Sequence, residues 1–310
     1  MPAKAKVPKQ KSRVRKARSY KSFTLSKKIK PSKPLPGPIK LLKQSFRVVF
    51  SNKKIFIGFV LFGGILGWLL VQGFGSSINF TDLKQSTEEI LGQQGQNTST
   101  NLVLLAELVG SSGANTGQVA GVYQTALTIV LSLAIIWALR QIQAGEKISL
   151  RNTFYKGMYP LIPFILVLLV IGLQLIPLLL GNIIFSAVFA GGLAVTALET
   201  ILWIAIVTLL SLLSIYMIMS SIMALYIVTL PDMTPMKALR SARGLVMHRR
   251  MSVAVRLLFL LIILGIIMVL VILPLIFIWP VVVEASLYLV SSFLLVLTHS
   301  YIYSLYRSLL

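Results

Sequence analysis

The sequence contains no cysteine and only two histidines, His248 and His299. Without cysteine the chain forms no disulfide, binds no metal through a thiolate and has no thiol nucleophile. Two histidines far apart in the sequence do not form the ligand clusters on which zinc or iron sites depend. The sequence therefore predicts no metal centre and no cofactor.

Acidic residues are scarce as well. Eight Asp and Glu stand against 30 Lys and Arg, which gives a net charge of +22. No two carboxylates are spaced to face each other within an apolar segment, and neither a glycine-rich phosphate loop nor a Ser, His and Asp set in catalytic order occurs. We therefore expect a protein that is not an enzyme.

Apolar residues dominate the chain. Hydrophobic residues make up 56% of the sequence and charged residues 12%, and the mean hydropathy is +0.85. Soluble folds contain only about 45 to 50% apolar residues. This composition excludes a water-soluble core and predicts an all-α polytopic membrane protein.

Six apolar segments are long enough to cross a hydrocarbon core of about 30 Å, which needs about 20 helical residues. The predicted transmembrane helices are residues 55–72, 119–139, 160–180, 197–228, 253–278 and 281–303. Together they form a membrane domain over 39–310, with a disordered basic tail over 1–38. The polar residues 73–117 are predicted to form an extracytoplasmic loop, within which 101–109 is apolar enough for a short helix.

The apolar stretch 158–230 holds either two spans or three, and hydropathy alone does not decide between them. Two spans place the next loop, which contains Lys237, Arg240 and Arg243, on the same side as the basic tail, as the positive-inside rule favours. Residues 181–195 are then expected to form an apolar turn or a short interfacial helix. Six spans result, with both termini in the cytoplasm and the chain in the cell membrane.

The basic tail has three interpretations. Eighteen of the 30 Lys and Arg fall in residues 1–54, where no acid occurs. They can attract anionic lipids, at about 1 kcal/mol for each cation near the surface. They can instead neutralise phosphates of ribosomal RNA or DNA, with Tyr20 and Phe23 as stacking groups, or bind a cytoplasmic protein. Positive-inside topology alone is the third interpretation, although fewer charges would orient the chain.

A short pattern recurs before the first, third and fifth spans. Residues 42–46, 150–154 and 239–243 each read leucine, cation, polar residue, small residue and bulky residue. The first and third copies extend further at a constant offset, with Lys40 matching Lys237 and Val49 matching Val246. The pattern predicts three repeats of an interfacial helix followed by a membrane hairpin. The alternative is a coincidence arising from abundant leucine and from positive-inside bias.

The third copy predicts a basic amphipathic helix. Thr234 suits an N-cap and Pro235 the first helical position. On a helical projection the apolar residues lie opposite the cations, which favours a helix in the interface with its cations among anionic headgroups. Across the repeats, the residues predicted to contact anionic lipid or a partner are Lys40, Lys43, Arg47, Arg151, Lys237, Arg240, Arg243 and Arg250.

Residues 231–264 resemble bacterial six-span membrane families named for the membrane domain of glycerophosphoryl diester phosphodiesterases. The matching residues are Pro235, Ala238, Leu239, Ser241, Leu245 and Val246. The aromatic residue expected at the start of the fifth span is absent, and Met251 and Ser252 stand there instead. The resemblance implies fold and membrane residence rather than chemistry, because catalysis in the enzymes of that name belongs to a separate soluble domain.

Glu199, Glu284 and His299 are the ionisable residues in or beside the spans, and such residues are candidates for a polar site within the membrane. Both glutamates lie near the ends of their spans, where water is accessible. His299 is expected to bond to neighbouring hydroxyls or a carbonyl. The amides of Gln174 and Asn182 are expected to bond across helices.

These observations favour a non-enzymatic membrane protein that organises anionic lipid, or a partner, through its basic helices and tail. A transporter or permease subunit is the first alternative, suggested by the repeated hairpins. A tether for ribosomes or nucleic acid is the second.

The absence of cysteine makes the topology directly testable. In an Arg243→Cys chain, the single thiol should resist a membrane-impermeant maleimide added outside intact cells and react after permeabilisation. A Ser99→Cys chain should react from outside in both conditions. Labelling of Arg243→Cys in intact cells would contradict the predicted topology.

Overall fold

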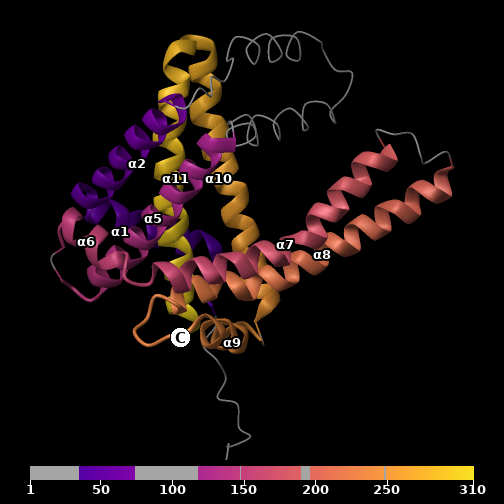
Figure 1. Ribbon diagram of the computed structural model, residues 1–310, viewed down its shortest axis with the longest axis horizontal. Coiled ribbons are helices and arrows are strands. Elements are labelled where there is room, and N and C mark those ends of the chain that lie inside the picture. Colours follow the sequence, from indigo (N-terminus) through magenta and orange to yellow (C-terminus); the bar gives the residue numbers. More distant parts are fainter. Residues whose placement is uncertain (1–34, 74–117, 147, 190–195, 248) are drawn as a thin grey trace, which may run out of the picture. The chain divides into compact units, whose positions relative to one another are not determined.

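The computed structural model describes residues 35–73, 118–146, 148–189, 196–247 and 249–310. Within these ranges it contains nine helices and no strand (Figure 1). Most of the basic tail and of the loop over 73–117, including 101–109, lies outside the described residues.

Six of the described helices are long and apolar enough to cross a membrane. They are α2 (Lys53–Gly73), α5 (Gln118–Gln143), α7 (Leu161–Phe189), α8 (Ala197–Ile227), α10 (Arg250–Ile278) and α11 (Pro280–Leu309). They confirm the predicted α-helical class and the number of spans. The chain is a multi-pass membrane protein. Trp279 separates α10 from α11, and Pro280 is the first residue of α11, since proline lacks the N–H that a continuing helix would use.

Three short helices precede the first, third and fifth spans. They are α1 (Pro38–Ser51), α6 (Leu150–Gly157) and α9 (Pro235–Val246). The start of α9 is as predicted: the Thr234 hydroxyl accepts a hydrogen bond from the Lys237 N–H at 3.4 Å, and Pro235 is the first helical residue. The cap satisfies one of the N–H groups that a helix start leaves unpaired.

The short helices bury the same positions of the repeat. Ser45 on α1, Thr153 on α6 and Ala242 on α9 are buried, and so are the residues four positions later, Val49, Gly157 and Val246. The Ser45 and Thr153 hydroxyls each donate to the carbonyl four residues earlier, at 2.8 Å. The repeat seen in the sequence therefore extends to side-chain burial.

Each short helix packs on the second span of a hairpin. In the chain, α6 packs on the preceding α5 and α9 on the preceding α8, while α1 packs on α11, the last span. The same contact thus occurs three times, and its first copy joins the N-terminal end of the membrane domain to the C-terminal end. The predicted apolar face of α9 is in large part covered by α8, because Ala238, Ala242 and Val246 are fully buried.

Glycines on α2 allow close packing within the chain. A Cβ atom at Gly63 would lie 2.7 Å from a Leu131 side-chain carbon of α5 and 2.8 Å from the Ser292 Oγ of α11. A Cβ atom at Gly67 would lie 3.4 Å from the Tyr288 ring of α11. Helix backbones approach closely where small residues face each other in a membrane. These glycines serve packing inside the bundle.

The third span is longer than predicted. Helix α7 continues to Phe189, so the expected turn or separate interfacial helix is wrong for residues 181–189. Gly181 does not end the helix, because a backbone in lipid must satisfy its own hydrogen bonds. It lies instead against α8, where a Cβ atom would make ordinary contacts with Val207 and Leu210 at 3.6 to 3.7 Å. Helices α7 and α8 run side by side (Figure 1).

Pro177 interrupts the hydrogen bonding of α7, and Ser214 of α8 compensates. The Ser214 hydroxyl accepts a hydrogen bond from the Leu178 N–H at 3.2 Å and donates one to the Gln174 carbonyl at 2.6 Å. The hydroxyl is thereby inserted between the Leu178 N–H and the Gln174 carbonyl, which are one turn apart and would bond directly in a regular helix. Ser214 is fully buried, so this bridge joins the two helices inside the hairpin.

Substitution of Gly157 tests the contact between α6 and α5. A Cβ atom there would lie 3.1 Å from the Ala134 Cα and 3.3 Å from the Leu133 carbonyl oxygen, which are backbone atoms that cannot rotate away. We expect Gly157→Val to destabilise the detergent-solubilised protein by about 1 to 3 kcal/mol, seen as a lower midpoint of thermal unfolding.

The matched control is Gly244→Val on α9, where a Cβ atom would meet nothing within 4 Å. An equal midpoint of thermal unfolding for the two variants would show that the close approach of α6 to α5 does not stabilise the fold.

Candidate functional site

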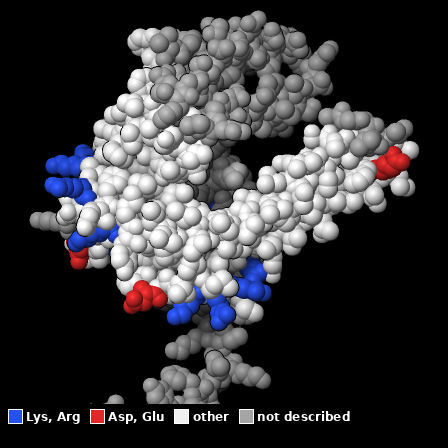
Figure 2. Space-filling view, in the orientation of Figure 1, with Lys and Arg blue, Asp and Glu red and all other residues white. Residues whose placement is uncertain are grey.

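The structure separates the predicted cations into two groups. Arg240 and Arg243 on α9 and Arg250 at the start of α10 line one pocket. The other predicted residues are exposed outside it: Lys40, Lys43 and Arg47 on α1, Arg151 on α6 and Lys237 on α9. Figure 2 shows the Lys and Arg side chains along the left and lower edges of the visible face, whose remaining described surface is largely uncharged.

The pocket has a volume of 400 Å³ and lies between α7, α8, α9 and α10; we name it the arginine pocket. Besides the three arginines it is lined by Gln174, Tyr216, Met217, Ser220, Ser221, Met236 and Leu239. No acidic residue is among these lining residues. Three positive charges that face one small volume repel one another, so an anion bound there lowers their electrostatic energy.

The arginine side chains retain their capacity to bind a ligand. In the part of the chain that the structure describes, Arg240 and Arg243 form no side-chain hydrogen bond and no ion pair. The Arg250 guanidinium carbon lies 4.3 Å from the centre of the Tyr216 ring, a cation–π contact that orients the group without using its N–H donors. Each guanidinium can therefore donate to a bound anion.

Gln174 contributes an unused acceptor. Its Oε1 atom is buried and has no hydrogen-bond partner among the described residues. The expected bond from this oxygen to a neighbouring helix is therefore not made. A buried acceptor without a donor costs about 1 to 3 kcal/mol, so a ligand hydroxyl or ammonium group that donates to it would gain stability. The Gln174 backbone is held by Ser214 at the Pro177 kink, which fixes where this side chain enters the pocket.

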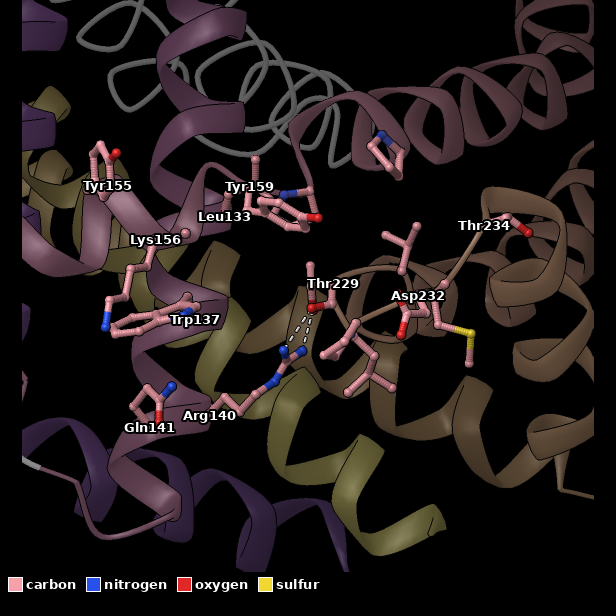
Figure 3. Close-up of a pocket in the computed structure, with 17 residues that line it drawn as sticks. Leu133, Trp137, Arg140, Gln141, Tyr155, Lys156, Tyr159, Thr229, Asp232 and Thr234 are labelled. Atoms are coloured by element: carbon pink, nitrogen blue, oxygen red, sulfur yellow. Dashed lines mark hydrogen bonds between the residues drawn. The ribbon is translucent and has the colours of Figure 1, made fainter. Parts of the chain in front are cut away.

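A second cavity, of 880 Å³, lies between α5, α6 and the connection from α8 to α9. Its centre is Arg140, which points toward Thr229, while Trp137, Tyr155 and Lys156 lie to one side of it (Figure 3). Arg140 donates to the Thr229 carbonyl at 2.7 Å and to the Thr229 hydroxyl. A cation at the carbonyl end of a helix is stabilised by the unpaired carbonyl groups there.

Arg140 thus fastens the end of α8 to α5, a role that the sequence does not reveal, since its position at the end of a span suggests only a headgroup anchor. Its donors are used within the protein, and Asp232 also lines this cavity. The arginine pocket, with three cations and no acid among its described lining residues, is therefore the stronger candidate for an anion site of the two.

Of the predicted polar residues within the membrane, Glu199 and His299 do not share a site. Glu199 forms a capping box at the start of α8: its N–H donates to the Thr196 hydroxyl at 3.3 Å, and its carboxylate accepts from the Thr196 N–H at 3.2 Å. His299 is buried on α11, with its Nδ1 atom 2.9 Å from the Tyr226 hydroxyl. Tyr226 lies about 40 Å from Glu199 along α8, at about 1.5 Å per residue. Glu284 lies in the second turn of α11, and its side chain is outside the described part.

Loss of the Arg140 clamp should destabilise the fold. Arg140→Gln leaves the Thr229 carbonyl without its donor, while the Tyr226 carbonyl still accepts from the Thr229 hydroxyl. We expect a cost of about 1 to 3 kcal/mol, measured as a lower midpoint of thermal unfolding in detergent. Arg151→Gln removes the same charge from an exposed position on α6 and should leave the midpoint unchanged. If the two variants unfold alike, Arg140 does not hold α8 to α5.

Comparisons of the chain with protein-family models, with curated proteins and with solved structures give no match. The resemblance to the six-span families therefore stays a prediction.

Proposed function

We propose that this protein is a non-enzymatic membrane protein that binds phospholipids with anionic headgroups, and that the arginine pocket is its specific site. The observation that carries the proposal is the convergence of Arg240, Arg243 and Arg250 on one pocket whose lining contains no acid. The proposal includes cytoplasmic termini and residence in the cell membrane, because the positive-inside rule puts the basic end of the molecule there.

The chemistry of the pocket suits a phosphate group with hydroxyls beside it. Guanidinium groups bind phosphate oxygens through two parallel hydrogen bonds, which makes arginine better suited than lysine to this task. The Gln174 Oε1 atom accepts a hydrogen bond, which a phosphate oxygen cannot supply but a headgroup hydroxyl can. Phosphatidylglycerol carries both groups and is the lipid that we choose as the test ligand.

The surroundings favour a lipid over a soluble anion. The pocket is formed in part by α7, α8 and α10, which are membrane spans, and Met217, Met236 and Leu239 contribute apolar surface to its lining. A headgroup attached to acyl chains can place its phosphate on the arginines and its apolar part along these spans. A small soluble anion would leave the apolar surface unused.

The remaining cations attract anionic lipids without selecting among their headgroups. Lys40, Lys43, Arg47, Arg151 and Lys237 are exposed on the short helices that precede the spans. Near an anionic membrane surface each contributes about 1 kcal/mol, and salt weakens the effect. In this proposal they raise the local concentration of anionic lipid, and the arginine pocket selects the headgroup.

The test measures phosphatidylglycerol binding to the full-length protein in detergent by native mass spectrometry, with phosphatidylcholine as the reference lipid. We expect Arg240→Gln combined with Arg243→Gln to weaken phosphatidylglycerol binding at least about tenfold, since hydrogen bonds to charged groups contribute about 1.5 to 3 kcal/mol each. Phosphatidylcholine binding should change little.

The matched control removes two cations from α1 by combining Lys40→Gln with Lys43→Gln. It should leave the tightest phosphatidylglycerol site intact and lower only weak, salt-sensitive binding. An equal loss of phosphatidylglycerol binding in the two double variants would indicate general electrostatic attraction instead of a specific site. The proposal would be refuted if the unmodified chain bound phosphatidylglycerol no better than phosphatidylcholine.

A further inference from the structure

A separate, open cavity lies between α5, α7, α8 and α11 and has a volume of 570 Å³. It shares no lining residue with the arginine pocket. Among the residues that the structure describes, its lining includes no charged one, which sets it apart chemically from the pockets around Arg140 and Arg240.

One wall of the cavity is polar. Gln124, Thr125, Thr128 and Ser132 lie on one stripe of α5. Gln124, Thr128 and Ser132 follow one another at intervals of four residues, and Thr125 comes three residues before Thr128, so all four fall on one side of the helix. The Thr125 and Thr128 hydroxyls each donate to a backbone carbonyl of α5 at 2.8 Å. Their oxygen atoms remain free to accept a hydrogen bond, and the Gln124 amide can donate as well as accept.

The opposite wall is apolar, formed by Phe164 and Leu168 of α7 and Leu225 of α8. Polar side chains within a membrane helix are costly when they face lipid and usually face another helix with which they can bond. Here the Thr125 and Thr128 hydroxyls donate within α5, and the described residues on the other side of the cavity offer their acceptor sites no further partner. This asymmetry fits an occupant that is polar on one side and apolar on the other.

His299 adds a further hydrogen-bonding group to the cavity. It lines the cavity and is 7% exposed, and its Nδ1 atom is 2.9 Å from the Tyr226 hydroxyl. Its second ring nitrogen, Nε2, has no hydrogen bond within the described residues. In either neutral tautomer this nitrogen can donate or accept one hydrogen bond, so it can serve a hydroxyl group of a ligand.

The absence of charge from the lining limits the ligand. An anion or a metal ion in a cavity of low polarity needs an opposite charge nearby, and the described residues of the lining provide none. A neutral hydroxyl needs only hydrogen bonds, which the α5 stripe and His299 can supply. The ligand that fits is therefore uncharged, with one hydrogen-bonding end and one apolar end.

We infer that this cavity is a binding site for an uncharged glycerolipid with a free hydroxyl, the chemical class of a diacylglycerol. The hydroxyl end lies against the α5 stripe and His299, and an acyl chain lies against α7 and α8. This site is distinct from the anionic-headgroup site and does not depend on it.

The test uses the full-length protein in nanodiscs of phosphatidylcholine that contain dioleoylglycerol, and measures retained dioleoylglycerol by native mass spectrometry. Thr125→Val combined with Thr128→Val keeps the side-chain shape and removes both hydroxyls. We expect about a tenfold loss of dioleoylglycerol, since each hydrogen bond contributes about 0.5 to 1.5 kcal/mol. Thr208→Val, at an exposed position on α8, is the matched control and should bind normally.

Leu168→Trp is the second variant, because it fills the cavity from the apolar wall and leaves the polar stripe intact. It should abolish retention while the protein still elutes as a folded species in size-exclusion chromatography. Dioleoylglycerol retained equally by the unmodified chain and by Leu168→Trp would overturn the inference, as would no retention by the unmodified chain, which would indicate a cavity filled by water alone.

The two sites can be told apart in the same preparations. The Arg240→Gln and Arg243→Gln double variant should bind less phosphatidylglycerol and retain a normal amount of dioleoylglycerol. The Thr125→Val and Thr128→Val double variant should retain less dioleoylglycerol and bind phosphatidylglycerol normally. If every variant lowers both lipids together, neither pocket is a separate site.

Discussion

The packing of each short helix onto the second span of a hairpin is the contact on which the rest of the structure depends. It occurs between α6 and α5, between α9 and α8, and between α1 and α11. Small residues such as Gly157 and Ala242 make it possible, because they allow the helices to approach closely. The three-fold repetition of one contact explains how hairpins with long apolar helices are held in a defined order in a solvent that offers little hydrophobic driving force between spans.

The arginine pocket is a consequence of that contact. Because α9 buries Ala238, Ala242 and Val246 against α8, its cations must face away from that contact, and Arg240 and Arg243 then meet Arg250 from the next helix. The other wall depends on the kink at Pro177, where Ser214 holds the backbone of Gln174. Charge convergence and the unpaired amide oxygen therefore have structural causes, and both favour an anionic ligand with hydrogen-bond donors.

Two sets of polar groups in the membrane helices play different parts. Ser214, Arg140 and Glu199 complete hydrogen bonds that helix ends or a proline leave open, so they stabilise the fold. On the polar stripe of α5, the Thr125 and Thr128 hydroxyls donate within their own helix and keep acceptor capacity toward the cavity, and the second ring nitrogen of His299 also faces it. This unused hydrogen-bonding capacity is why we assign a ligand to the cavity rather than a purely structural role.

The sequence by itself determined the helical membrane class, the number of spans, the position of the short helices and the cap at Thr234, because hydropathy, breakers and caps act over a few neighbouring residues. It did not determine that α7 continues past Gly181, since a glycine ends helices in water but not where lipid forbids open backbone groups. Only the tertiary structure decided which cations converge, that Arg140 binds Thr229, and that Gln174 lacks a partner. Those facts depend on contacts between residues far apart in the chain, and no local pattern encodes the distance between them.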